Sequence, residues 1–101
     1  YDAVVQISPN FCSAHFNKAN ELKRLKRFND SLAAYVKAIE VEPNHSSAHF
    51  NKAIVLKELN LENDAIESYK KCIEIEPSHD EAHYNLGNLF YEQKCFQGAL
   101  E

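Results

Sequence analysis

The sequence predicts an all-α protein, an α-solenoid of antiparallel helix pairs with a 34-residue repeat. Prolines stand at positions 9, 43 and 77, which are 34 residues apart. Three other residue types recur in the same register, namely Tyr1, Tyr35 and Tyr69, then His15, His49 and His83, then Asn17, Asn51 and Asn85. Apolar residues between these anchors follow three- and four-residue steps, which is helical spacing. A fixed period of 34 with helical spacing in each copy indicates a helix-turn-helix solenoid.

Aligned on this period, the chain divides into two complete repeats and two partial ones. We expect residues 12–45 and 46–79 to be the complete repeats. Residues 1–11 are then the end of a preceding repeat, and residues 80–101 are the first part of a following one. Neither end has the polar outer face of a capping repeat. We therefore expect one array, residues 1–101, that is a fragment of a longer solenoid.

Each complete repeat contains two amphipathic helical segments, and their apolar residues predict the core. In residues 12–45 these are Ala14, Ala19, Leu22 and Leu25, then Leu32, Tyr35, Ala38 and Ile39. In residues 46–79 they are Ala48, Ala53, Leu56 and Leu59, then Ala65, Ile66, Tyr69, Cys72 and Ile73. Small residues recur at two levels of the first segments, Ala14, Ala48 and Ala82, and Ala19, Ala53 and Gly87. They predict close approach of helix backbones.

Prolines and polar residues predict where these helices end. Each proline removes an N–H and disfavours helix in the residue before it, so the second helix should stop there. The residues after the prolines are expected to be turn or N-cap residues, and they are Asn10, Asn44 and Ser78. The turn within each pair contains Lys26, Asn60 or Lys94. Asn60 tolerates a left-handed conformation, whereas the lysines indicate a different turn.

Composition excludes several classes of function. With a net charge of −4, a general nucleic-acid binder is not expected. No apolar run approaches the length of a membrane span and no signal peptide is visible, so we expect no membrane partner. Cys12, Cys72 and Cys95 are far apart, odd in number and outside any CxxC motif. We expect them to be reduced thiols of a cytoplasmic protein, with the nucleus as the alternative.

The repeats resemble a known family. Residues 80–101, DEAHYNLGNLFYEQKCFQGALE, resemble a tetratricopeptide repeat, and the complete repeats share its Ala-His-Phe-Asn-Lys-Ala segment, late Tyr and closing Glu-Pro. The resemblance covers the entire chain. Lys18 and Lys52 depart from it, because the family usually has Leu there. The resemblance implies a right-handed superhelix in which first helices line a concave groove and second helices form the convex back.

On that basis the first helices carry a candidate peptide-binding site. Its residues are Phe16, Asn17, Asn20, Lys23, Phe50, Asn51, Lys57, Tyr84, Asn85 and Asn88. An asparagine amide offers a donor and an acceptor, so the row at positions 17, 51 and 85 could pair with the backbone of an extended peptide. Two alternatives remain open: the asparagines fix the spacing between repeats, and the aromatic residues belong to the core.

Charge along the groove is uneven. Lys23, Arg24 and Lys57 make its first half basic, and Glu58, Glu81 and Glu92 make its later half acidic. We expect a bound peptide to be acidic where it meets Lys23 and Lys57, with solvated surface charge as the alternative. One branch of the family clamps the acidic C-terminal tails of heat-shock chaperones. Asn20 and Asn51 match that clamp, but its basic positions hold Phe16, Glu81 and Asn85, which disfavours this role.

Neither a metal site nor a catalytic site is predicted, and no cofactor. His45 and His49, like His79 and His83, have the i,i+4 spacing of paired metal ligands. The first histidine of each pair should lie at a helix start, however, and no cysteine or second histidine pair is expected to supply the remaining ligands. The sequence contains no phosphate-binding glycine loop, nucleophile motif or HExxH. We therefore predict that the chain is not an enzyme.

Three functions are compatible with these features. A scaffold or adaptor that holds a peptide or partner subunit in the groove is favoured. The alternatives are a substrate-recruiting arm of a larger enzyme, such as a glycosyltransferase, and an assembly-only solenoid that uses its convex or end faces. Apolar end faces also predict self-association.

Overall fold

The computed structural model describes the backbone of residues 9–100 and the side chains of residues 12–93. It contains the helices α2 (Pro9–Arg24), α3 (Phe28–Val41), α4 (Ser46–Glu58), α5 (Glu62–Ile75) and α6 (Asp80–Leu100). The described residues include no strand. The predicted all-α class is therefore confirmed, and no described helix has both the length and the apolar character needed to cross a membrane.

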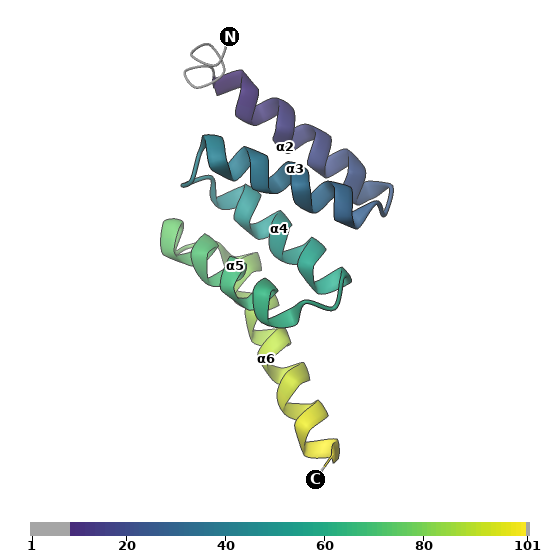
Figure 1. Ribbon diagram of the computed structural model, residues 1–101. Coiled ribbons are helices and arrows are strands. Elements are labelled where there is room, and N and C mark those ends of the chain that lie inside the picture. The colour runs from purple at the N-terminus through teal and green to yellow at the C-terminus, as the bar shows by residue number, and fades with distance from the viewer. Residues whose placement is uncertain (1–8, 101) are drawn as a thin grey trace.

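The helices are arranged as a stack in which each packs on the next. Contacts join α2 to α3, α3 to α4, α4 to α5 and α5 to α6, and α2 also touches α4. Figure 1 shows the resulting elongated body, with α2 at one end of the stack and α6 at the other. This is the predicted α-solenoid, since each helix pair buries its apolar face against a neighbouring pair.

The core lies inside the pairs and between them, and two tyrosines are its largest buried members. Tyr35 packs in a cluster with Ala19 and Ala34 of its own repeat and Val55 of the next. Tyr69 packs with residues of its own repeat and with Ala82 and Leu89 of α6. Burial of a large apolar side chain contributes roughly 1.5–3 kcal/mol. The tyrosines thus join successive repeats, as their 34-residue spacing predicts.

The small residues at these two positions of the repeat are not all buried to the same extent. Ala19, Ala53, Ala48 and Ala82 are fully buried. Ala14 and Gly87 are exposed, and nothing lies within 4 Å of the place where a Cβ on Gly87 would be. The prediction of close packing is therefore wrong at these last two positions. The reason is that no other described helix covers the Gly87 side of α6 or the Ala14 side of α2.

The turns within the two complete repeats share one conformation. Lys26 has a φ of 63° and Asn60 a φ of 64°. After Lys26, the Arg27 N–H donates to the Leu22 carbonyl at 2.9 Å, and Leu61 donates to Leu56 at 2.8 Å in the same way. These are the hydrogen bonds of a Schellman motif, which requires a left-handed residue whatever its type. The expectation of a different turn at Lys26 is therefore wrong.

The turn expected at Lys94 is absent. In the described chain α6 continues without a break from Asp80 to Leu100 and passes through this position. Lysine is a good helix former, and an uninterrupted helix satisfies the backbone hydrogen bonds of this segment.

Histidines, and not the residues after the prolines, cap α4 and α6. α3 and α5 end at Val41 and Ile75, before Pro43 and Pro77 as predicted. Asn44 and Ser78 lie in the turns, which confirms the turn half of that prediction. The N-caps are one residue later: His45 Nδ1 accepts the Ala48 N–H at 3.1 Å, and His79 Nδ1 accepts the Ala82 N–H at 3.2 Å. Asn10 lies inside α2, so it is not a cap either.

Candidate functional site

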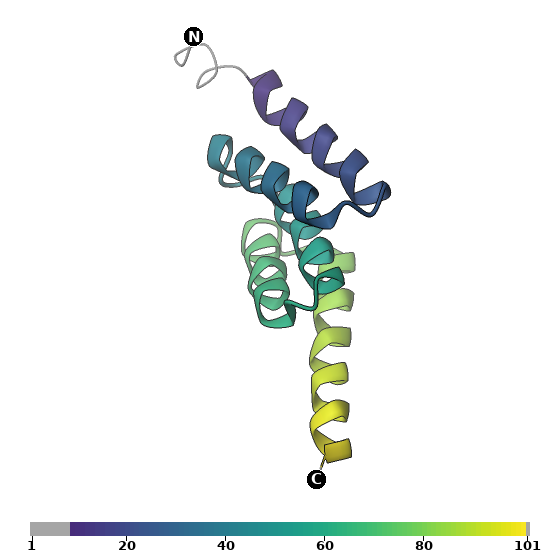
Figure 2. The same cartoon turned by 45° about the vertical axis from the view of Figure 1, so that its right-hand side comes forward.

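The ten predicted site residues all lie on α2, α4 and α6, the first helices of their repeats. α2 carries Phe16, Asn17, Asn20 and Lys23, α4 carries Phe50, Asn51 and Lys57, and α6 carries Tyr84, Asn85 and Asn88. In Figure 2, α2 and α6 run along one side of the stack and α3 and α5 along the other. We call the surface formed by these ten residues the first-helix surface.

A polar network links α2, α3 and α4 on this surface. Asn51 Nδ2 donates to Asn20 Oδ1 at 3.1 Å, and Lys23 Nζ donates to Asn51 Oδ1 at 3.4 Å. The buried Tyr35 hydroxyl also donates to Asn20 Oδ1. Burial raises the pKa of Tyr35 to about 12, so this hydroxyl stays protonated. The network holds Asn20, Lys23 and Asn51 in place before any ligand arrives.

The three asparagines of the predicted row lie at equivalent positions but in unlike environments. Asn17 is exposed, and its side chain makes no hydrogen bond to the described residues. Asn51 is half-buried and uses both amide atoms within the chain. Asn85 is half-buried beside Tyr69: burial raises the pKa of this tyrosine, and hydrogen bonding to Asn85 opposes the rise. The contacts of Asn51 support the alternative that it fixes the spacing between repeats, while each amide atom keeps further hydrogen-bonding capacity.

Two of the three aromatic residues pack on other rings of their own repeat. The Phe16 ring lies 6.0 Å from Tyr35 in a T-shaped arrangement and 4.7 Å from His45. Phe50 repeats this geometry, at 5.8 Å from Tyr69 and 4.6 Å from His79. Tyr84 differs, because it is 71% exposed. Phe16 and Phe50 thus have a structural role whether or not a ligand touches them, and Tyr84 is the ring most accessible to a partner.

The predicted basic half of the surface is partly neutralised. Arg24 forms an ion pair with Glu21 on its own helix. Lys57 Nζ lies 3.7 Å from Glu92 on α6. Lys23 is the one of the three cations with no carboxylate partner among the described residues, and burial lowers its pKa. Among these three cations, Lys23 is therefore the one whose charge is not offset by a described carboxylate.

Two hollows open on the described surface. One of about 250 Å³ lies between α4, α5 and α6 and brings together Lys57, Asn85 and Asn88. Its wall also includes Ile54, Glu58 and Tyr69, which were not among the predicted site residues. Tyr69 was assigned to the core because its spacing matches Tyr35, and sequence spacing alone does not reveal that its edge reaches a hollow.

The second hollow, of about 460 Å³, lies on an end face formed by α2 and α3. Its lining includes His15, Lys18 and Leu22, and none of the ten predicted residues. The equivalent residues of the next repeat, His49 and Leu56, are buried. The hollow thus lies over the face of α2 whose equivalent on α4 is buried against a neighbouring repeat. It is a less suitable site for a peptide than the first-helix surface.

Comparison with known families identifies the repeat. Models of the tetratricopeptide repeat match residues 12–45 and 34–67, and a model described as TPR repeat matches residues 63–94. The matches together span residues 12–94, and one of them has the same bounds as the first complete repeat. The chain belongs to the tetratricopeptide repeat family. No curated protein matches its sequence.

The architecture of this tetratricopeptide repeat chain is similar to that in the crystal structure of MamA. The TM-score is 0.81 at 19% sequence identity, over 82% of this chain and 48% of the MamA chain. The chain thus spans about half the length of the structure it matches. At this identity the likeness shows a shared solenoid fold, which together with the repeat family indicates a protein-interaction scaffold.

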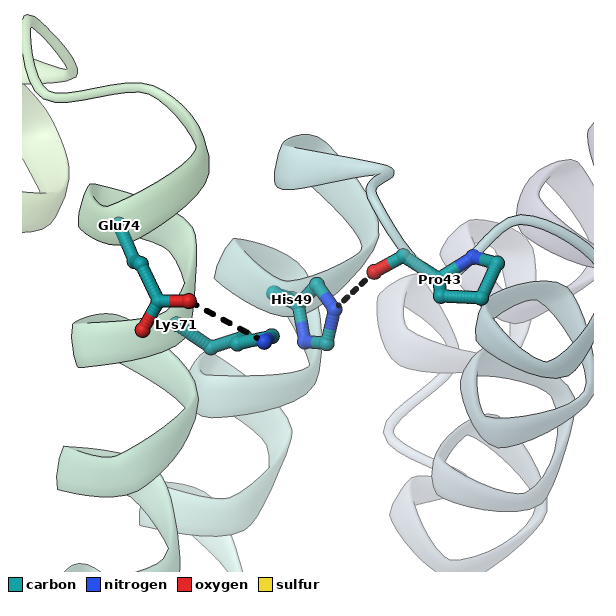
Figure 3. Close-up of polar contacts among 4 residues, drawn as sticks. All are labelled: Pro43, His49, Lys71 and Glu74. Carbon is teal, nitrogen blue, oxygen red and sulfur yellow. Dashed lines mark hydrogen bonds and ion pairs between the residues drawn. The ribbon is translucent and has the colours of Figure 1, made fainter.

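Two histidines of this tetratricopeptide repeat chain, His49 and His83, hydrogen-bond to backbone carbonyls. His49 Nε2 lies 2.9 Å from the Pro43 carbonyl, and His83 Nε2 lies 2.8 Å from the Pro77 carbonyl. Figure 3 shows His49 between the Pro43 turn and Lys71 of α5. The Lys71 ammonium forms an ion pair with Glu74 on the same helix. Burial lowers the pKa of His49, and the hydrogen bond to Pro43 opposes this fall. These bonds join each proline turn to the next helix.

Proposed function

We propose that this tetratricopeptide repeat chain is a cytosolic or nuclear scaffold that holds an extended, acidic segment of a partner protein along its first-helix surface. The observation that carries the proposal is the position of Lys23. Its ammonium is partly buried, bound to the Asn51 amide and without a carboxylate among the described residues. An acidic side chain or C-terminus of the partner would supply that carboxylate.

The electrostatic argument is that of an incompletely solvated cation. Burial disfavours the charged form of Lys23, as the lowered pKa indicates. A carboxylate at hydrogen-bond distance restores the lost interaction and raises this pKa again. Because the site is partly shielded from solvent, the pair is worth more than an exposed ion pair, which contributes about 0–1 kcal/mol. Binding should therefore make Lys23 harder to deprotonate.

The rest of the first-helix surface offers further groups that could contact an extended ligand. Exposed Asn17, Tyr84 and Asn88 provide polar and aromatic groups on either side of the Lys23 network. The hollow beside Asn85 has room for a ligand side chain. Lys57 should contribute less than Lys23, because a ligand carboxylate would compete with Glu92 for its ammonium.

The test is capture of partners from native extract by the wild-type array and by variants of two faces. A variant with Asn17, Asn51 and Asn85 all changed to Ala should lose the partners that bind the first-helix surface. At about 1 kcal/mol for each hydrogen-bonding side chain, the loss is about 3 kcal/mol, or on the order of a hundredfold in affinity. Lys23→Met, which keeps the apolar stem, should weaken binding of the same partners when it is made without the three Asn→Ala changes.

The matched control is a double Glu40→Ala and Glu67→Ala variant. Both residues are exposed on the second helices α3 and α5, so this variant should still bind the partners of the first-helix surface. Thermal unfolding of each variant separates lost binding from lost folding, which matters for Asn51 because of its contact with Asn20. Partners that bind the triple-alanine and Lys23→Met variants as tightly as wild type would contradict the proposal and assign binding to the convex or end faces.

A further inference from the structure

Three potential metal ligands meet where the first complete repeat joins the second. Cys12 lies in the first turns of α2, Glu42 follows the end of α3, and His45 precedes α4. Their ligand atoms, the Cys12 thiol sulfur, a carboxylate oxygen and an imidazole nitrogen, all lie within 4.8 Å of one another. Cys12 is 3% exposed, His45 is half-buried and Glu42 is exposed. The cluster therefore has a buried soft donor and an opening to solvent.

We propose that Cys12, Glu42 and His45 form a binding site for a divalent metal ion of the zinc class, with water as the fourth ligand. Thiolate, imidazole and carboxylate are the three protein ligands that zinc takes, with bonds of about 2.0–2.3 Å. Donor atoms around one tetrahedral zinc are then about 3.5 Å apart. Small side-chain movements, mainly of the exposed Glu42, bring the three atoms to that separation. A sulfur donor favours zinc over magnesium or calcium.

The second repeat contains the same arrangement without the metal chemistry. There the equivalent residues are Ser46, Glu76 and His79, and the Ser46 hydroxyl donates to the Glu76 carboxylate at 2.8 Å. A neutral hydroxyl that is already bonded to the carboxylate is a poor metal ligand. Cys12 makes no such bond to Glu42, and its thiol instead meets the Ala38 carbonyl at 3.4 Å. The cysteine thus replaces a satisfied hydroxyl–carboxylate pair with two groups that a cation can bridge.

The charge of the site fits a cation. Burial raises the pKa of the Cys12 thiol, and the nearby Glu42 carboxylate raises it further. A divalent ion between the Cys12 sulfur and the Glu42 carboxylate would be bound by both groups, and binding would release the Cys12 proton to solvent.

Binding also has a structural consequence that can be observed. His45 Nδ1 accepts the Ala48 N–H in the metal-free chain. A metal on Nδ1 occupies that lone pair, and a metal on Nε2 places the ring proton on Nδ1, so either mode ends this hydrogen bond. The Ala48 amide should therefore report metal binding. The Ala82 amide, which is bound in the same way by His79, should not.

The experiment is titration of the protein with Co²⁺, followed by displacement with Zn²⁺. The starting protein carries Cys72→Ala and Cys95→Ser, so that Cys12 is its only thiol. One equivalent of Co²⁺ should produce thiolate-to-cobalt charge-transfer absorption, which Zn²⁺ removes. In NMR spectra with Zn²⁺, the Ala48 amide signal should shift and the Ala82 signal should stay in place. Cys12→Ser, which copies the second repeat, should abolish all of these changes.

A gain-of-function variant gives the matched control. Ser46→Cys should add a second equivalent of bound Co²⁺ and make the Ala82 amide respond as well. Circular dichroism establishes that each variant is folded. The proposal is overturned if the starting protein shows no charge-transfer absorption, if the absorption survives in Cys12→Ser, or if Ser46→Cys remains at one equivalent.

Discussion

The junction of α2 and α3 with α4 and the junction of α4 and α5 with α6 have the same backbone plan but different polar chemistry. In the first junction Asn20 links Tyr35 to Asn51, whereas Ile54 occupies the equivalent position in the second. Lys23 binds an amide in the first junction, and Lys57 pairs with a carboxylate in the second. The repeat thus constrains the packing residues and leaves the polar residues of the first-helix surface free to differ.

The shared part of the junctions is a contact set of aromatic rings. The Phe–Tyr distances are 6.0 and 5.8 Å, both with an interplanar angle of 62°. The Phe–His distances are 4.7 and 4.6 Å. Such agreement follows because these rings set the distance between helices, and any change in one of them would alter the spacing of the stack.

The largest expected effect comes from giving the first junction the residue of the second. Asn20→Ile removes the acceptor for the Tyr35 hydroxyl and for the Asn51 amide. Because the hydroxyl is buried, the free energy of unfolding should fall by about 1–3 kcal/mol, as measured by urea unfolding. The conservative Ile54→Val in the second junction is the control, with a loss of about 0.5–1.5 kcal/mol. An Asn20→Ile protein as stable as wild type would mean that the network adds nothing to the first junction.

A second difference should appear when pH is varied. His49 is 7% exposed and its counterpart His83 is exposed. Burial lowers the pKa of His49, and positive charge on Lys52 and Lys71 adds to this. The folded state therefore prefers neutral His49. The stability that neutral His49 contributes is fully present above the unfolded-state pKa of about 6.5 and is lost as pH falls below that value. The free energy of unfolding should fall by at most about 1.4 kcal/mol per pH unit in this range.

Urea unfolding at a series of pH values measures this effect. His49→Gln should flatten the acid side of the stability profile. His83→Gln is the matched control, and its profile should follow that of wild type. If both variants change the profile equally, burial is not what distinguishes the two histidines.

The smallest expected effect concerns the two left-handed turns. Lys26 and Asn60 have nearly the same φ, but a left-handed conformation costs a lysine about 1–2 kcal/mol, whereas asparagine tolerates it better. Lys26→Gly should therefore raise the free energy of unfolding by about 0.5–1 kcal/mol, after the extra chain entropy of glycine is included. Asn60→Gly should gain less. Thermal unfolding of the two variants decides this, and a larger gain at Asn60 would refute the explanation.

The sequence predicts on which helices the candidate residues lie, but it does not predict their contacts. The 34-residue period assigned all ten residues to first helices, where the structure has them. It treated Asn17, Asn51 and Asn85 as equivalent, although only Asn51 lies in the network with Asn20 and Lys23. A period describes equal positions, but the partners of a side chain depend on residues of the neighbouring helix, and these differ between repeats.

What the sequence determined by itself is the architecture: the helix pairs, the proline turns and the tyrosines between repeats. These follow from local propensity and from a regular pattern of apolar residues, which need no knowledge of distant contacts. The contact of Lys23 with Asn51, and the position of Cys12 beside Glu42 and His45, follow from tertiary packing instead. Lys23 and Asn51, like Cys12 and Glu42, are about thirty residues apart in the chain, so their distances are set by how closely helices pack within a repeat and between repeats.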